Sequence, residues 1–166
     1  PVMALAVSRK EASLLRRIRG LLPKSDAGSY LVGGYIRDTL LGRKTRDIDL
    51  AVGGNAIAVA QEVAAALDGH YVLLDETEGI ARVVLIENEA GRETQWHLDF
   101  STIRGTIESD LSRRDFTIDA MAMDLSDIGK RSPPRLIDPF GGKKDLETGL
   151  IRAVGASIFE DDPARL

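Results

Sequence analysis

The stretch YLVGGYIRDTLLGRKTRDIDLAV, residues 30–52, contains the pattern that decides the fold. Its apolar residues 30–32 predict a short strand, which runs into a turn of two glycines. Residues 35–41 predict a helix that a further glycine ends, and residues 48–52 predict the next strand. A strand, a glycine turn, a helix and a second strand therefore follow one another within this stretch.

Two aspartates, Asp47 and Asp49, stand where the second of these strands begins. Alternate residues of a strand face the same side about 6.6 Å apart, so both carboxylates can point into one space. Two negative charges so close repel unless a cation lies between them, and oxygen ligands favour a hard ion such as Mg²⁺. Taken alone, the pattern is weak, and two exposed carboxylates at a strand edge are the simpler interpretation.

A third acid, Asp99, lies on the polar face of a predicted strand over residues 94–101, in which apolar and polar residues alternate. If this strand neighbours the first, Asp99 can reach the same ion. A solvated acid on the face of a sheet is an equally good interpretation of Asp99 alone.

The glycine turn supplies groups of the opposite kind. Gly33 and Gly34 allow the backbone to come close to an anion, and the free N–H groups at the following helix start attract phosphate. Arg37, one turn into that helix, can add a bidentate contact to a phosphate oxygen. A plain turn is the usual role of two glycines, but here carboxylates follow shortly along the chain. The combination suggests phosphoryl or nucleotidyl transfer with a divalent ion.

The rest of the chain interleaves helices with strands, as expected for one domain of 166 residues. The patterns predict helices over 9–22, 56–67 and 107–112, and strands over 71–74, 80–86 and 94–101. We expect an α+β fold with a mixed, mostly antiparallel sheet and helices packed on one face.

Composition excludes several classes of protein. Without cysteine there are no disulfides, thiol nucleophiles or cysteine-ligated zinc sites. The net charge of −4 is wrong for a domain that coats nucleic acid, so any RNA is held locally or by parts outside this chain. The only histidines, His70 and His97, are interpreted as ordinary strand residues. No apolar run approaches the roughly 18 residues that cross a bilayer, so we expect no membrane partner and a cytoplasmic location.

Six segments occur in an order that is typical of one family. They are LVGGYIRD (31–38), LLGRKTRDIDLAV (40–52), DFSTIR (99–104), DLSRRDFTIDAMAM (110–123), LIDPFGGKKDL (136–146) and FEDDPAR (159–165). With them the chain resembles the class II nucleotidyltransferases of the DNA polymerase beta superfamily, namely tRNA CCA-adding enzymes and bacterial poly(A) polymerases. The implied fold is a nucleotidyltransferase (DNA polymerase beta-like) head over residues 1–155, with residues 156–166 starting a helical neck.

The resemblance also implies roles for individual residues. It implies that Gly33, Gly34 and Arg37 hold the incoming triphosphate, that Asp47, Asp49 and Asp99 bind two catalytic Mg²⁺ ions, and that Arg104 contacts the nucleotide. It implies that Arg113, Arg114 and Asp115 arrange the nucleotide pocket and its hinge, and that Asp162 and Arg165 select the base.

The implied activity is template-independent addition of CMP, AMP or both, from CTP and ATP, to the 3′ end of tRNA with release of pyrophosphate. The chain begins at Pro1 and stops at Leu166 in mid-pattern, as expected for an excised piece whose downstream parts hold the tRNA or other RNA. Three alternatives remain open: a poly(A) polymerase, a catalytically silent nucleotide-binding module, and a nucleotidyltransferase that acts on small molecules.

Three departures from the family pattern bear on the activity. Asp119 stands where the family usually has Asn, which adds a charge near the nucleotide pocket unless the side chain caps a helix. The pair Asp161-Asp162 replaces the usual Glu-Asp of the neck motif. Residues 105–108 are short where many CCA-adding relatives have a long loop, and in the family such shortening accompanies CC addition.

Overall fold

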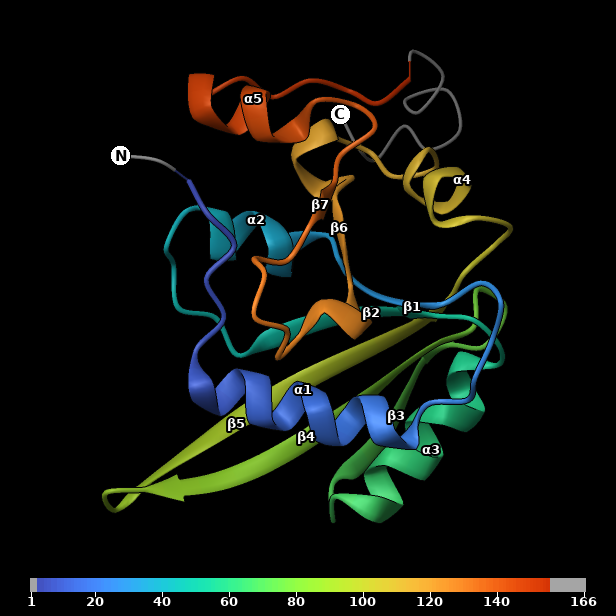
Figure 1. Ribbon diagram of the computed structural model, residues 1–166. Coiled ribbons are helices and arrows are strands. Elements are labelled where there is room, and N and C mark those ends of the chain that lie inside the picture. Colours follow the sequence, from blue (N-terminus) through green and yellow to red (C-terminus); the bar gives the residue numbers. More distant parts are fainter. Residues whose placement is uncertain (1–2, 156–166) are drawn as a thin grey trace.

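A mixed sheet forms the centre of the computed structural model, which describes residues 3–155 (Figure 1). In this part of the chain the strand order is β3-β4-β5-β2-β1-β6-β7. The strands are β1 (Ser29–Val32), β2 (Asp47–Val52), β3 (His70–Asp75), β4 (Ile80–Glu89), β5 (Arg92–Thr102), β6 (Ala122–Asp124) and β7 (Leu136–Ile137). Strands β2 and β5 are parallel, and all the other pairs are antiparallel. The predicted mixed, mostly antiparallel sheet of an α+β fold is therefore confirmed.

Helices connect these strands. They are α1 (Arg9–Leu21), α2 (Gly34–Leu40), α3 (Ala56–Ala66), α4 (Ile107–Leu111) and α5 (Gly142–Thr148), with two short 3₁₀ turns, η1 (Thr117–Asp119) and η2 (Leu125–Asp127). None of them is long and apolar enough to cross a bilayer. The expected neck, with Asp161, Asp162 and Arg165, lies outside the described residues.

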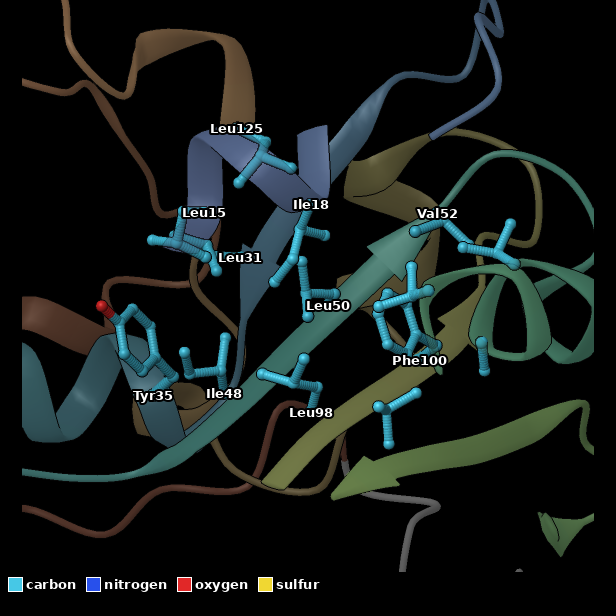
Figure 2. Packing of buried hydrophobic residues seen from close by; sticks show 14 of the residues in the cluster. Leu15, Ile18, Leu31, Tyr35, Ile48, Leu50, Val52, Leu98, Phe100 and Leu125 are labelled. Atoms are coloured by element: carbon cyan, nitrogen blue, oxygen red, sulfur yellow. The ribbon is translucent and has the colours of Figure 1, made fainter. Parts of the chain in front are cut away.

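One face of the sheet carries the main hydrophobic core (Figure 2). The alternate residues Ile48 and Leu50 of β2 point into it and are fully buried, as are Leu98 and Phe100 of β5. Helices α1 and α3 pack on this same core, to which they contribute Leu15, Ile18, Val59 and Val63. Because β2 alternates, the residues between its core positions must face the opposite side.

The opposite face is only partly covered. A second, smaller cluster there joins Val32, Ala51 and Ala122 of the sheet to Ile107 and Leu111 of α4. Helix α4 therefore packs on the side away from α1 and α3, beyond the arrangement expected from the sequence. The β2 residues before Ala51 lie outside this cluster, and they include both aspartates of the Asp-x-Asp pair.

Helix α5 is not among the helices that the sequence patterns predict. Its start is fixed by Asp138, whose carboxylate accepts from the backbone N–H groups of Gly142 at 2.7 Å and Lys143 at 3.0 Å. Its middle is fixed by the buried Asp145, which accepts from the Thr117 hydroxyl at 2.6 Å. These contacts come from the tertiary fold, which apolar periodicity along the chain does not reveal.

Candidate active site

The three predicted acids meet on the open face of the sheet. In the parallel pairing of β2 with β5, Asp49 lies directly opposite Asp99, and Asp47 lies opposite His97. Residues in register on neighbouring strands point to the same face, so the predicted convergence of two strands is present. These four side chains line one cavity of about 330 Å³ together with Gly34, Tyr35, Arg37, Asp38 and Arg82.

The glycine turn lies against Asp49. Gly33 adopts a φ of 63°, a conformation that side chains disfavour, and a Cβ there would lie 3.0 Å from Nη1 of Arg114. A Cβ on Gly34 would lie 3.7 Å from Oδ2 of Asp49 and 3.2 Å from Nη2 of Arg37. Backbone, carboxylate and guanidinium thus come together because the two residues have no side chains.

The carboxylate of Asp49 is held in an unfavourable environment. Burial raises its pKa above the usual range, the negative charges of Asp99 and Asp47 raise it further, and the Arg114 charge and a hydrogen bond from the Tyr35 backbone oppose the shift. Asp47, by contrast, has a side chain that is 76% exposed. A cation beside Asp49 would relieve this repulsion, which is the electrostatic condition for a metal site.

Asp99 already has a cationic partner, which sequence reasoning missed. Arg82 of β4 lies opposite Asp99 in the antiparallel register. It donates to both carboxylate oxygens, from Nε at 2.7 Å and from Nη2 at 3.0 Å. The signal was present in the sequence, because Arg82 is the one charged residue within the run 80–86 of a predicted strand.

The donor set fits a hard divalent ion. No group of three His, Cys, Asp or Glu side chains within residues 3–155 is already arranged to hold a metal. Asp47 and Asp49 nevertheless offer carboxylate oxygens to the shared cavity, whereas those of Asp99 are engaged by Arg82. Mg²⁺ is commonly bound by one or two carboxylates and completed by substrate phosphates and water. Two carboxylates that line one cavity beside a glycine turn satisfy this requirement.

Arg37 is held by carboxylates on two sides. Its Nε donates to Asp38 at 3.1 Å, and its Nη1 donates to Asp119 at 2.6 Å. Among residues 3–155 the third nitrogen, Nη2, has no hydrogen-bond partner, and it lies beside Gly34. Arg37, the predicted ligand of a phosphate, therefore lies at the glycine turn. One of its two partners is Asp119, which is among the three departures from the family pattern.

Three further predicted arginines, Arg104, Arg113 and Arg114, line a second cavity of about 250 Å³, which also contacts Ser101 of β5. Arg104 donates to Glu78 at 2.5 Å, and Arg113 donates to the Arg104 carbonyl oxygen at 2.9 Å. Arg114 forms an ion pair with Asp110 at 3.6 Å. Because Ser101 and Asp99 are alternate residues of β5, both cavities open on the same face of the sheet.

Arg114 lies between the second cavity and the glycine turn. It lines this cavity, yet its Nη1 approaches Gly33, and its buried Nε lacks a hydrogen-bond partner in the part of the chain that the structure describes. An unpartnered buried donor suits a site that receives an anion. Asp115 follows it, and the Asp115 carbonyl oxygen accepts from the Val154 backbone at 3.0 Å.

Two further residues are clarified by the structure. Tyr35, which follows the glycines, has its ring in the main core, where its hydroxyl donates to Glu11 at 3.2 Å (Figure 2). His97 was interpreted as an ordinary strand residue, but its Nδ1 lies 3.4 Å from Oδ1 of Asp47. The sequence alone does not predict this contact, because it depends on the parallel pairing that places His97 of β5 opposite Asp47 of β2.

Comparisons with known proteins agree with this arrangement. A family model described as the poly A polymerase head domain matches residues 29–152. A CC-adding tRNA nucleotidyltransferase of Geobacter sulfurreducens is 39% identical over 93% of this chain and 34% of its own length. An A-adding tRNA nucleotidyltransferase of Halalkalibacterium halodurans is 35% identical over 99% of this chain and 40% of its own length.

Solved structures are similar too. The CCA-adding enzyme of Thermotoga maritima complexed with tRNA has a TM-score of 0.75 and 40% identity, over 96% of this chain and 36% of that one. A CCA-adding enzyme in complex with ATP has a TM-score of 0.76 and 38% identity, over 96% of this chain and 37% of that one. The chain thus spans little more than a third of the length of these relatives. Since the family model covers most of the chain and the glycine turn and acids lie together, the chain belongs to the poly A polymerase head-domain family of nucleotidyltransferases.

Proposed function

We propose that this chain is the catalytic head of an enzyme that adds CMP, AMP or both, from CTP and ATP, to the 3′ end of tRNA. The observation that carries the proposal is the register of Asp49 with Asp99, next to Gly33, Gly34 and Arg37. The tRNA-directed names of the similar proteins support the substrate class. We further propose that the enzyme works in the cytoplasm and that regions outside this chain grip the RNA.

In the proposed reaction, the RNA 3′-hydroxyl oxygen forms a bond to the α-phosphorus of the nucleotide while the bond to pyrophosphate breaks. The hydroxyl proton passes to water, and pyrophosphate is released. The Gly34 backbone N–H of the glycine turn and the Nη2 group of Arg37 bind the triphosphate oxygens, while Gly33, whose own N–H donates to the Met121 carbonyl oxygen, shapes the turn. Asp47 and Asp49 would hold Mg²⁺, and Asp99, whose carboxylate Arg82 engages in the structure, would be the third acid. When bound, two Mg²⁺ ions would supply Lewis-acid stabilisation of the attacking and leaving oxygens.

The arginines of the second cavity contribute in a different way. Arg104, Arg113 and Arg114 line a cavity on the same face of the sheet as the three acids. This cavity can receive the rest of a nucleotide whose triphosphate is bound at the glycine turn. We propose that Asp115 arranges this pocket, and that Asp162 and Arg165 select the base. Preorganised charges of this kind act chiefly by positioning the reactants and by stabilising charge in the transition state.

The proposal is tested on the full-length protein, with radiolabelled CTP or ATP and a tRNA transcript that lacks its 3′ CCA. We expect label to enter the tRNA with Mg²⁺, to stop entering it when EDTA removes the metal, and to enter again when Mg²⁺ is restored. The controls are a tRNA with a blocked 3′ end and the Arg37→Ala protein. Incorporation that survives EDTA would contradict the role of the metal.

Product length separates the remaining alternatives. Two added cytidines indicate CC addition, one adenosine indicates A addition, and a long adenosine tail indicates a poly(A) polymerase. Binding of CTP that needs no metal, without any transfer, would instead support a silent nucleotide-binding module.

A further inference from the structure

Asp119 lies at the end of η1 and holds the arginine that is proposed to receive the triphosphate. Its Oδ1 accepts from Nη1 of Arg37 at 2.6 Å, a short distance typical of a charge-assisted hydrogen bond. Both side chains are about 30% exposed, so solvent weakens this pair but does not abolish it. An asparagine here could accept the same hydrogen bond without bringing a charge.

The position of Asp119 is fixed by the elements around it. The Thr117 hydroxyl at the other end of η1 is tied to the buried Asp145 of α5. The Asp119 carbonyl oxygen would lie 3.9 Å from a Cβ on Gly33, so η1 borders the glycine turn itself. The Gly33 backbone N–H in turn donates to the Met121 carbonyl oxygen just beyond η1, at 3.2 Å. The fold therefore holds the Asp119 carboxylate next to the glycine turn.

The local charge works against an anion. Arg37 carries one positive charge but contacts two carboxylates, those of Asp38 and Asp119. A triphosphate that approaches Nη2 meets a guanidinium already neutralised by its own partners, and it must compete with Asp119 for that positive charge. An asparagine in the same place would remove this competition and leave an acceptor for Nη1.

We propose that Asp119 sets the affinity of this site for the triphosphate by competing for Arg37, so that the chain binds nucleotide more weakly than it would with a neutral asparagine at this position. The inference rests on the proposed function, because it assigns the triphosphate to the glycine turn. It concerns the phosphate chain and not the base, since both contacts of Asp119 are with the turn and with Arg37.

The test compares wild-type protein with Asp119→Asn by isothermal titration calorimetry, using MgCTP, inorganic tripolyphosphate and cytidine as probes. We expect the Kd values for MgCTP and tripolyphosphate to fall about threefold to tenfold, as suits the removal of one like charge at a partly exposed site. The Kd for cytidine should not change. The gain in affinity for MgCTP and tripolyphosphate should be smaller at high salt, where charge interactions are screened. In a transfer assay KM should fall while kcat does not rise, the signature of uniform binding.

The matched control is Asp127→Asn, which removes the same charge from an ion pair with Lys130 and should leave all three Kd values unchanged. Equal binding of tripolyphosphate by the wild-type and Asp119→Asn proteins would overturn this inference alone. So would weaker binding of every probe by a folded Asp119→Asn protein, because Asp119 would then support the site structurally. A wild-type protein that binds neither MgCTP nor tripolyphosphate would overturn the proposed function as well.

Discussion

Asp49→Asn is expected to lose nucleotidyl transfer almost completely while the protein remains folded. We expect at least about a 100-fold fall in kcat, since changing even the hydrogen-bonding partners of metal ligands typically costs 10-fold to 100-fold. Asparagine has nearly the same shape as aspartate, but it offers the cation a neutral oxygen in place of a charged one. The readout is single-turnover incorporation of labelled CMP or AMP at saturating Mg²⁺.

The same substitution should raise stability at neutral pH. Because burial and neighbouring acids raise the pKa of Asp49 in the folded protein, the ionised carboxylate disfavours the native state. The protonated side chain of Asp49 contributes favourably to the free energy of folding, and this contribution is fully present below its ordinary pKa of 3.8. It is lost as the pH rises through the higher pKa that Asp49 has in the folded protein. Asparagine removes the charge and hence the penalty.

Thermal unfolding of both proteins across a pH series measures this effect. We expect Tm of Asp49→Asn to exceed that of wild type at pH 7, and the difference to shrink as the pH falls toward 3.8. Asp47→Asn is the matched control, because its mostly exposed carboxylate should change stability by no more than about 0.5 kcal/mol. It should nevertheless lose transfer. An Asp49→Asn protein that is less stable than wild type at pH 7, or fully active, would contradict the account.

Gly142→Ala is expected to give the largest loss of stability among the substitutions considered. A Cβ at this position would lie 2.1 Å from the Thr117 carbonyl oxygen and 3.1 Å from Cγ of the fully buried Met121. Neither the backbone of η1 nor Met121 has free space to move into, so α5 must shift away from η1. We expect a loss of about 2–3 kcal/mol, at the upper end of overpacking costs. That loss should lower the midpoint of urea unfolding.

Gly20→Ala in α1 is the control for this prediction. Apart from its neighbours and the backbone of its own helix, no heavy atom of residues 3–155 lies within 4 Å of a Cβ at Gly20, and the residue is helical. There alanine should stabilise the protein by up to about 1 kcal/mol through helix propensity. The opposite signs of the two changes separate steric conflict from backbone preference. If Gly142→Ala unfolded at the wild-type urea concentration, the packing of α5 on η1 would be wrong.

Much of the site could be predicted because its parts are local in sequence. The period-2 alternation of β2 and β5 predicts correctly that Asp47 and Asp49 share a face, and that Asp99 lies on the polar side of its strand. The turn of Gly33 and Gly34 is local in the same way, because two glycines between a strand and a helix permit a conformation that other residues disfavour.

What could not be predicted depends on contacts between distant segments. The pairing of Arg82 with Asp99 requires the register of β4 on β5, and that of His97 with Asp47 requires β5 beside β2. The link between Arg37 and Asp119 joins residues 82 positions apart, and it exists only because α5 holds η1 beside the glycine turn. Helix α5 itself depends on Asp138 and on the buried Asp145, not on an apolar stripe.

The central claim is that Asp47 and Asp49 hold a divalent cation beside the glycine turn that binds the triphosphate. Crystals soaked with Mn²⁺ and a non-hydrolysable CTP analogue test it most directly. The account predicts an anomalous scattering peak between the carboxylates of Asp47 and Asp49, with the phosphate chain lying over Gly33 and Gly34. Clear density for the analogue, with the Mn²⁺ peak absent from these carboxylates or held by other residues, would contradict it.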